Sequence, residues 1–163
     1  MKDLYSAPLG GRATIVTGAG SGIGQAAALA FARAGSGVAL VGRRSEPLED
    51  TARQIEAAGG AALVLTGDVS SAAEAEAIVS RAADHFGRLD HLFNNAGIQG
   101  PTTPIVDMAE DDFDAVIAIN LKGPWLMTRA ALRAPPVMRA PEPRAAPEGR
   151  APRVDRPNDV RED

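Results

Sequence analysis

The sequence predicts an α/β fold built on a doubly wound parallel sheet, followed by a tail that does not belong to the fold. Three observations lead to this fold class. Short β-branched runs alternate with longer helical patterns between residues 12 and 97, an order that produces parallel strands joined by right-handed crossovers. The runs are largely apolar throughout instead of alternating, as expected for strands covered on both faces. After residue 133 both patterns stop.

Four apolar runs are predicted to be strands, so the sheet is expected to be incomplete, with about four strands. They are ATIVTG at 13–18, GVALVG at 37–42, AALVLTG at 61–67 and LDHLFNNAG at 89–97. We therefore expect an N-terminal extension at 1–11, a partial domain at 12–133 and a tail at 134–163.

The second and third helical segments have recognisable ends. Ser45 is predicted to cap the second helix and Gly59 to stop it. Ser71 and Glu74 form a capping box at the start of the third helix, which ends at Gly87. The apolar faces at helical spacing are Leu48, Ala52, Ile55 and Ala58 in the second helix, and Ala75, Ile78, Val79, Ala82 and Phe86 in the third.

A fourth helix is predicted from Asp107, with Glu110 completing another capping box, to Arg133. Pro124 lies inside this helix, and its ring crowds the carbonyl four residues earlier, which belongs to Asn120. We therefore expect a bend near Asn120 that leaves its carbonyl without the usual partner.

The tail at 134–163 is rich in Pro, Arg and Ala and contains no aromatic residue, Leu or Ile. Such a composition cannot build a core, so the tail is predicted to be disordered. Its arginines and acids nearly balance, which favours a polyampholyte with polyproline II character.

Composition excludes several classes of function. A formal charge of −4 with scattered basic residues gives no field for nucleic acid. No apolar run is long enough for a membrane span and the N-terminus lacks a signal-peptide core, so a cytoplasmic location is expected. There is no cysteine, and His85 and His91 lack companions for a metal site, so no metal is expected.

A glycine-rich stretch, TGAGSGIG at 17–24, lies between the first predicted strand and the first helix. Glycines at 18, 22 and 24 permit a tight turn, and the N–H groups at the start of the helix point at any ligand bound there. A glycine cluster at this junction of a βαβ unit predicts a Rossmann-type site for the pyrophosphate of a dinucleotide.

The glycine spacing is G-x-x-x-G-x-G, and three further motifs follow it in order: GDV at 67–69, NNAG at 94–97 and INLKG at 119–123. Together these motifs resemble the short-chain dehydrogenase/reductase family over roughly residues 9–133. This is about the N-terminal half of a typical member. The resemblance implies an NAD(P)-dependent oxidoreductase that transfers hydride between the cofactor and an alcohol or carbonyl substrate and is usually homo-oligomeric.

The resemblance also implies roles for individual residues. The pyrophosphate loop would comprise Gly18, Ser21, Gly22, Ile23 and Gly24. Asp68 and Val69 would flank the adenine ring, whereas Asn95, Ala96 and Gly97 would support the sheet and line the cofactor on its ribose side. Asn120 matches the catalytic asparagine, whose carbonyl holds a proton-relay water in the family; a purely structural, buried asparagine at a kink is the alternative.

The choice of cofactor is expected at the end of the second predicted strand. A carboxylate there would bind the ribose of NAD, whereas arginine accommodates the 2′-phosphate of NADP. The sequence has Gly42 followed by Arg43 and Arg44, so NADP is favoured over NAD. The alternative is that both arginines belong to a solvated turn, in which case NAD could still bind.

The family's catalytic Ser and Tyr-x-x-x-Lys have no counterpart, because Tyr5 is the only tyrosine, Lys2 and Lys122 are the only lysines, and no serine follows Ser80. We therefore expect this chain to be inactive by itself, with a small-molecule substrate only in an intact homologue. The fourth predicted strand would form an exposed edge. We expect a frameshift or truncation to account for the tail, with a natural pseudoenzyme that carries an interaction tail as the alternative. For the function of the chain, the alternatives to an oxidoreductase by descent are a non-catalytic dinucleotide-binding module and an interaction protein that uses its tail.

Overall fold

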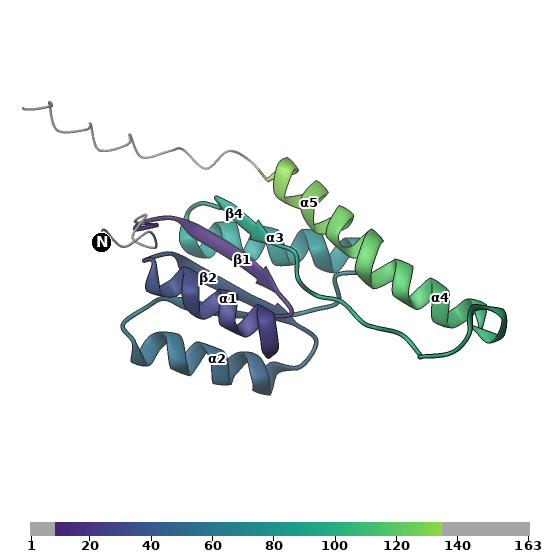
Figure 1. Ribbon diagram of the computed structural model, residues 1–163. Helices are drawn as coiled ribbons and strands as arrows, with labels where there is room; N and C mark the ends of the chain where they lie inside the picture. Colours follow the sequence, from purple (N-terminus) through teal and green to yellow (C-terminus); the bar gives the residue numbers. More distant parts are fainter. Residues whose placement is uncertain (1–8, 135–163) are drawn as a thin grey trace, which may run out of the picture.

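The computed structural model describes residues 9–134, which form a four-stranded sheet flanked by helices (Figure 1). All neighbouring strands are parallel and their spatial order is β3-β2-β1-β4. The strands are β1 (Ala13–Thr17), β2 (Gly37–Gly42), β3 (Ala62–Thr66) and β4 (His91–Phe93). Residues 1–8 of the predicted extension and 135–163 of the predicted tail lie outside the described residues.

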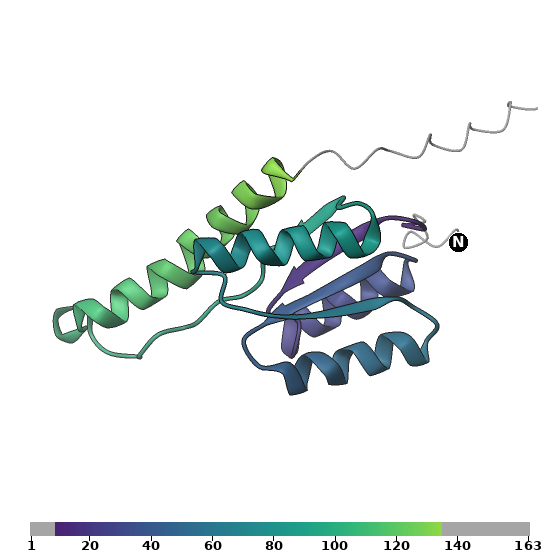
Figure 2. The same ribbon diagram turned by 180° about the vertical axis from the view of Figure 1, so that it is seen from behind.

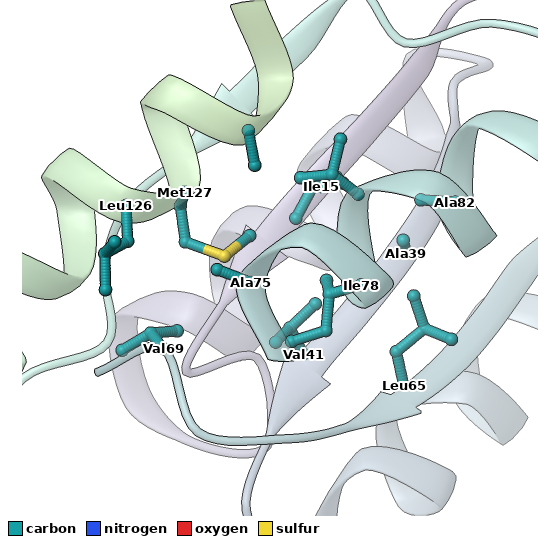
Figure 3. Packing of buried hydrophobic residues seen from close by; sticks show 12 residues of the cluster. Ile15, Ala39, Val41, Leu65, Val69, Ala75, Ile78, Ala82, Leu126 and Met127 are labelled. Carbon is teal, nitrogen blue, oxygen red and sulfur yellow. The ribbon is translucent and has the colours of Figure 1, made fainter. Parts of the chain in front are cut away.

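Helices cover both faces of the sheet (Figure 2). Side chains of β1 alternate between the two layers: Ile15 belongs to the cluster under one pair of helices and Val16 to the cluster under the other. Figure 3 shows the first cluster, in which Met127 and Ile78 pack with the sheet. This arrangement confirms the predicted doubly wound, Rossmann-type fold. The first cluster lies under α3 (Ala72–Phe86) and α5 (Gly123–Arg133), and the second lies under α1 (Gly22–Arg33) and α2 (Ser45–Ala57).

The ends of α2 and α3 depart in detail from the prediction. Ser45 is the first residue of α2 and Arg44 occupies the cap position, so the predicted serine cap is wrong. Ala58 follows the end of α2 and is exposed, unlike the other predicted apolar positions. Ser71 does cap α3, since its hydroxyl accepts the Glu74 N–H at 3.4 Å. The Glu74 carboxylate instead accepts the N–H of Asp68 at 2.9 Å.

The predicted fourth helix is divided into several segments. A short 3-10 turn, η1 (Ile105–Asp107), precedes α4 (Glu110–Ile117), whose cap position is Ala109; the capping box at Asp107 is therefore wrong. A π-helical turn, η2 (Ala118–Lys122), joins α4 to α5, and the predicted irregularity at Asn120 falls inside it. Pro124 lies in the first turn of α5, where a proline needs no hydrogen-bond donor.

Strand β4 is shorter than predicted and is anchored at its N-terminal end by Asp90. Its carboxylate accepts the Ala13 N–H at 2.9 Å and hydrogen bonds from Arg88 and Arg12. Burial alone raises the pKa of Asp90, but these hydrogen bonds outweigh burial and hold the pKa well below its usual range. The carboxylate therefore stays charged and joins the start of β4 to the start of β1.

Within residues 9–134, β4 pairs with β1 alone, so β4 is an edge strand in this part of the chain, as predicted. Figure 1 shows α4 projecting beyond the sheet, and α4 and η2 carry the exposed apolar side chains Phe113 and Leu121. No helix in the described range is both long and apolar enough to cross a bilayer.

Candidate functional site

The loop between β1 and α1 is open toward solvent at the start of the helix. Gly18 and Gly22 have φ angles of +68° and +54°, a left-handed conformation that favours glycine. Ser21 occupies the cap position, but its side chain makes no capping hydrogen bond, and the first turn of α1 contains no acidic residue. The first N–H groups of α1 are therefore placed to bind an anion.

Two of the loop glycines are required by packing. A Cβ atom at Gly18 would lie 2.9 Å from Asn95 Nδ2, and one at Gly24 would lie 2.5 Å from the same atom. The Gly24 Cβ would also lie 2.7 Å from the carbonyl carbon of Gly18. In contrast, a Cβ at Gly22 meets nothing within 4 Å. Gly22 therefore faces open space, whereas Gly18 and Gly24 let the loop close onto the segment after β4.

Thr17 and Asn95 join this loop to the segment after β4. The Thr17 hydroxyl accepts the N–H of Asn95 at 2.9 Å and of Ala96 at 3.0 Å, and donates to the Phe93 carbonyl at 3.4 Å. The Asn95 amide in turn donates to the Thr17 carbonyl at 3.0 Å. This network sets the end of β4 beside the end of β1, which is where the strand order of the sheet reverses.

A pocket lies at the carboxyl ends of the strands, the usual ligand position in an open α/β sheet. Seven of the predicted site residues line it: Gly18, Ser21, Arg43, Asp68, Val69, Ala96 and Gly97. The other predicted residues, Gly22, Ile23, Gly24, Asn95 and Asn120, do not line it, and the Ile23 side chain is 75% exposed. Lining residues that were not predicted as site residues are Gly20, Gly42, Arg44, Pro47, Leu48, Gly67, Ile98 and Ile119.

Sequence signals existed for some of these additional residues. Arg44 follows Arg43 directly, Ile98 follows the NNAG motif, and Ile119 is the first residue of the INLKG motif. Pro47 and Leu48 were assigned only to the helix, and no local pattern shows that the first turn of α2 also forms a wall of the pocket.

Asp68 supplies a charged acceptor at the end of β3. Its Oδ1 accepts the Ser70 hydroxyl at 2.7 Å and the Ser70 N–H at 2.9 Å. These two hydrogen bonds lower the pKa of Asp68; burial opposes the shift, and the nearby charge of Arg43 adds to it. The pocket therefore combines this carboxylate with two exposed arginines, Arg43 and Arg44, on the adjoining turn.

Asn120 uses its side chain to bind the backbone after β4. Its Oδ1 accepts the Ile98 N–H at 2.9 Å, and its Nδ2 donates to the Ile98 carbonyl at 2.8 Å. A Cβ at Gly97 would lie 3.2 Å from Asn120 Oδ1, so the two segments are in close contact. Asn120 is exposed, not buried as the structural alternative expected. Its amide nevertheless has a structural role, because it clamps the π-helical turn to the pocket wall.

The doubly wound sheet, with its glycine-rich loop opening into a pocket at the strand ends, defines a Rossmann-type protein. The family profile described as short chain dehydrogenase matches residues 12–141, and the chain belongs to this family.

Two similar proteins are an oxidoreductase and a reductase by name. The chain is 44% identical over 122 residues to an uncharacterized oxidoreductase of Thermotoga maritima, covering 75% of this chain and 47% of the relative. It is 40% identical over 124 residues to levodione reductase of Leifsonia aquatica, covering 75% of this chain and 46% of that protein.

Solved structures agree with this relationship. A metagenomic short-chain oxidoreductase in complex with NADP is 39% identical with a TM-score of 0.73, over 76% of this chain and 56% of that one. A 3-ketoacyl-ACP reductase from Sinorhizobium meliloti is 40% identical with a TM-score of 0.72, over 74% and 47%. The chain spans about half the length of the relatives it matches.

Proposed function

We propose that the chain provides the cofactor-binding part of an oxidoreductase that acts on alcohols or carbonyl compounds and prefers NADP to NAD. One observation carries the proposal: the glycine-rich loop and the Arg43-Arg44 turn line the same pocket, and Gly42 stands at the end of β2 where an NAD-binding protein would place a carboxylate. The NADP complex of a similar protein supports the same choice.

The residues of the pocket fit such a cofactor. The N–H groups at the start of α1, with Gly22 open beside them, would hold the pyrophosphate. The guanidinium groups of Arg43 and Arg44 would hold the 2′-phosphate by charge-assisted hydrogen bonds, and Asp68 with Val69 would flank the adenine ring. The nicotinamide ring of a bound cofactor would supply or accept the hydride.

We also propose that these 163 residues bind the cofactor without reducing a carbonyl. Asn120 binds Ile98 through both polar atoms of its amide, so the side chain acts as a clamp and leaves proton transfer to other groups. The tyrosine and lysine that would perform that transfer have no counterpart in the sequence. The resemblance assigns Asn120 to the catalytic set through its carbonyl, and this role stays a prediction.

Fluorescence titration of the 163-residue protein with NADPH and NADH tests the proposal. We expect saturable binding of both, with the Kd for NADPH about tenfold lower, as one charge-assisted contact would produce. Replacing both arginines, Arg43→Ala with Arg44→Ala, should abolish the preference and leave the Kd for NADH unchanged. Arg81→Ala, at an exposed arginine of α3 outside the pocket, is the matched control.

Failure to bind either nucleotide would refute the proposed function. Equal affinity for NADPH and NADH would refute the proposed preference, and turnover of a ketone by the purified chain would refute the absence of catalysis.

A further inference from the structure

A fully buried threonine, Thr51, connects three parts of the chain. It lies in α2, with no exposed surface, and its hydroxyl oxygen is 3.1 Å from the Ala19 carbonyl of the glycine-rich loop. The same oxygen is 3.0 Å from the Pro47 carbonyl and accepts a hydrogen bond from Gln25 Nε2, in α1, at 3.3 Å. The hydroxyl therefore contacts the loop and both helices of one layer.

The peptide group of Ala19 is held from both sides. Its N–H donates to the Val41 carbonyl at the end of β2 at 3.1 Å, and its carbonyl shares the single Thr51 hydroxyl proton with the Pro47 carbonyl. The next residue, Gly20, is so close to α2 that a Cβ there would lie 2.8 Å from the Pro47 Cβ. The loop is thus seated directly on the first turn of α2, the helix that follows Arg43 and Arg44.

We propose that Thr51 is a positioning residue that sets the distance between the glycine-rich loop and the Arg43-Arg44 turn. The inference rests on the proposed function, because it concerns a ligand with an anionic group at each of these two places. A helical threonine often bonds to the carbonyl four residues earlier, here that of Pro47, and such a bond alone would stabilise only α2. The contact with Ala19, 32 residues away in the sequence, gives Thr51 its role at the pocket.

The role predicts a specific effect on selectivity. NADPH must reach the glycine-rich loop with its pyrophosphate and the Arg43-Arg44 turn with its 2′-phosphate. Its affinity therefore depends on the distance between the loop and the turn. NADH lacks the 2′-phosphate, so its affinity does not depend on reaching the arginine turn. Loss of the Thr51 hydroxyl should therefore weaken NADPH more than NADH, whereas a general loss of stability would not change the ratio of the two.

The test is fluorescence titration of the full chain and its variants with both nucleotides. In Thr51→Val, which keeps the shape of the side chain, we expect the Kd for NADPH to rise about threefold to tenfold, the worth of one hydrogen bond, and the preference over NADH to fall. Thr51→Ser keeps the hydroxyl, so its Kd for NADPH and its preference for NADPH over NADH should both match the wild type. Thr14→Val is the matched control, since Thr14 is equally buried and its hydroxyl bonds to Ser36 in the sheet, away from the pocket.

A second variant covers the case in which Thr51→Val fails to fold. Gly20→Ala would push the loop away from Pro47 without touching Thr51, and it should lower the same preference. If both variants lower the Tm, as Thr14→Val is expected to do, but keep the wild-type ratio of the two Kd values, Thr51 is purely structural and the inference is overturned. If the wild-type chain binds neither nucleotide, the proposed function itself has failed, and the inference fails with it.

Discussion

Replacement of Gly24 by alanine should separate the packing of the glycine-rich loop from its conformational freedom. Gly24 is a buried residue of α1, so its backbone is helical and alanine would be acceptable there on backbone grounds. The added Cβ, however, would overlap the Gly18 carbonyl and lie 2.5 Å from Asn95 Nδ2. Neither neighbour can yield cheaply, because the Asn95 amide is hydrogen-bonded to the Thr17 carbonyl.

The expected magnitude follows from two opposing effects. Alanine in place of glycine inside a helix is favourable by up to about 1 kcal/mol. Overpacking typically costs about 1–3 kcal/mol, and more where backbone must move. Because the overlap here involves the carbonyl of Gly18, the steric cost should win, and we expect the free energy of unfolding to fall by about 2 kcal/mol. The Tm should fall by roughly 4 °C for each kcal/mol in a domain of this size.

Thermal unfolding followed by circular dichroism, together with NADPH titration, measures the effect. Gly24→Ala should lower the Tm and weaken NADPH binding about tenfold or more, because the displaced loop carries the anion site. Gly59→Ala is the matched control: its φ is +80° and nothing lies within 4 Å of the added Cβ. The control should lose about 1 kcal/mol through backbone strain alone and bind NADPH normally. A Gly24→Ala protein with wild-type Tm and affinity would refute the reasoning.

Three further predictions concern the ends of β1 and β4. Thr17→Val removes the acceptor of two N–H groups after β4, so the free energy of unfolding measured in urea should fall by about 1–3 kcal/mol. The control Thr66→Val, at an exposed threonine, should have little effect, and equal effects of the two variants would contradict the role of Thr17. Asn120→Leu should speed hydrogen exchange of the Ile98 amide by about tenfold, and unchanged exchange would refute the clamp. The pKa of Asp90 is lowered in the folded state, so its contribution to stability is full above its unfolded pKa of about 4 and is lost as pH falls through the folded value. Urea unfolding should therefore show a steeper loss of stability below about pH 4 in the wild type than in Asp90→Asn; identical pH profiles would refute this.

Much of the fold could be predicted because its signals are local. The run ATIVT at 13–17 does not alternate between polar and apolar residues, and the structure buries every residue of β1. The cap at Ser71 and the stop at Gly87, with a φ of +69°, depend on contacts within one turn of helix. The caps predicted at Ser45 and Asp107 were wrong by one and two residues, since Arg44 and Ala109 take these positions without a side-chain capping hydrogen bond. Helix ends fray over one or two residues, so a local pattern does not fix the first residue.

Less of the candidate site could be predicted, because motifs identify residues without giving their partners. Asn95 was expected to support the sheet. That its amide closes over Gly18 and Gly24 depends on two chain segments more than 70 residues apart meeting at the strand ends. Glu74 was predicted to complete a capping box; its carboxylate instead reaches the Asp68 N–H, because β3 delivers that group to the start of α3.

By itself, the sequence determined the order of strands and helices along the chain, the position of the glycine-rich turn and the pair of arginines after β2. All of these depend on periodicity and on residues within a few positions of one another. Only the tertiary structure decided that Asn120 clamps Ile98, 22 residues away, and that Thr51 holds Ala19, 32 residues away. The physical reason is that a side-chain hydrogen bond finds its partner only after the strands are in register. The sequence around the partner residue therefore shows no local sign of the contact.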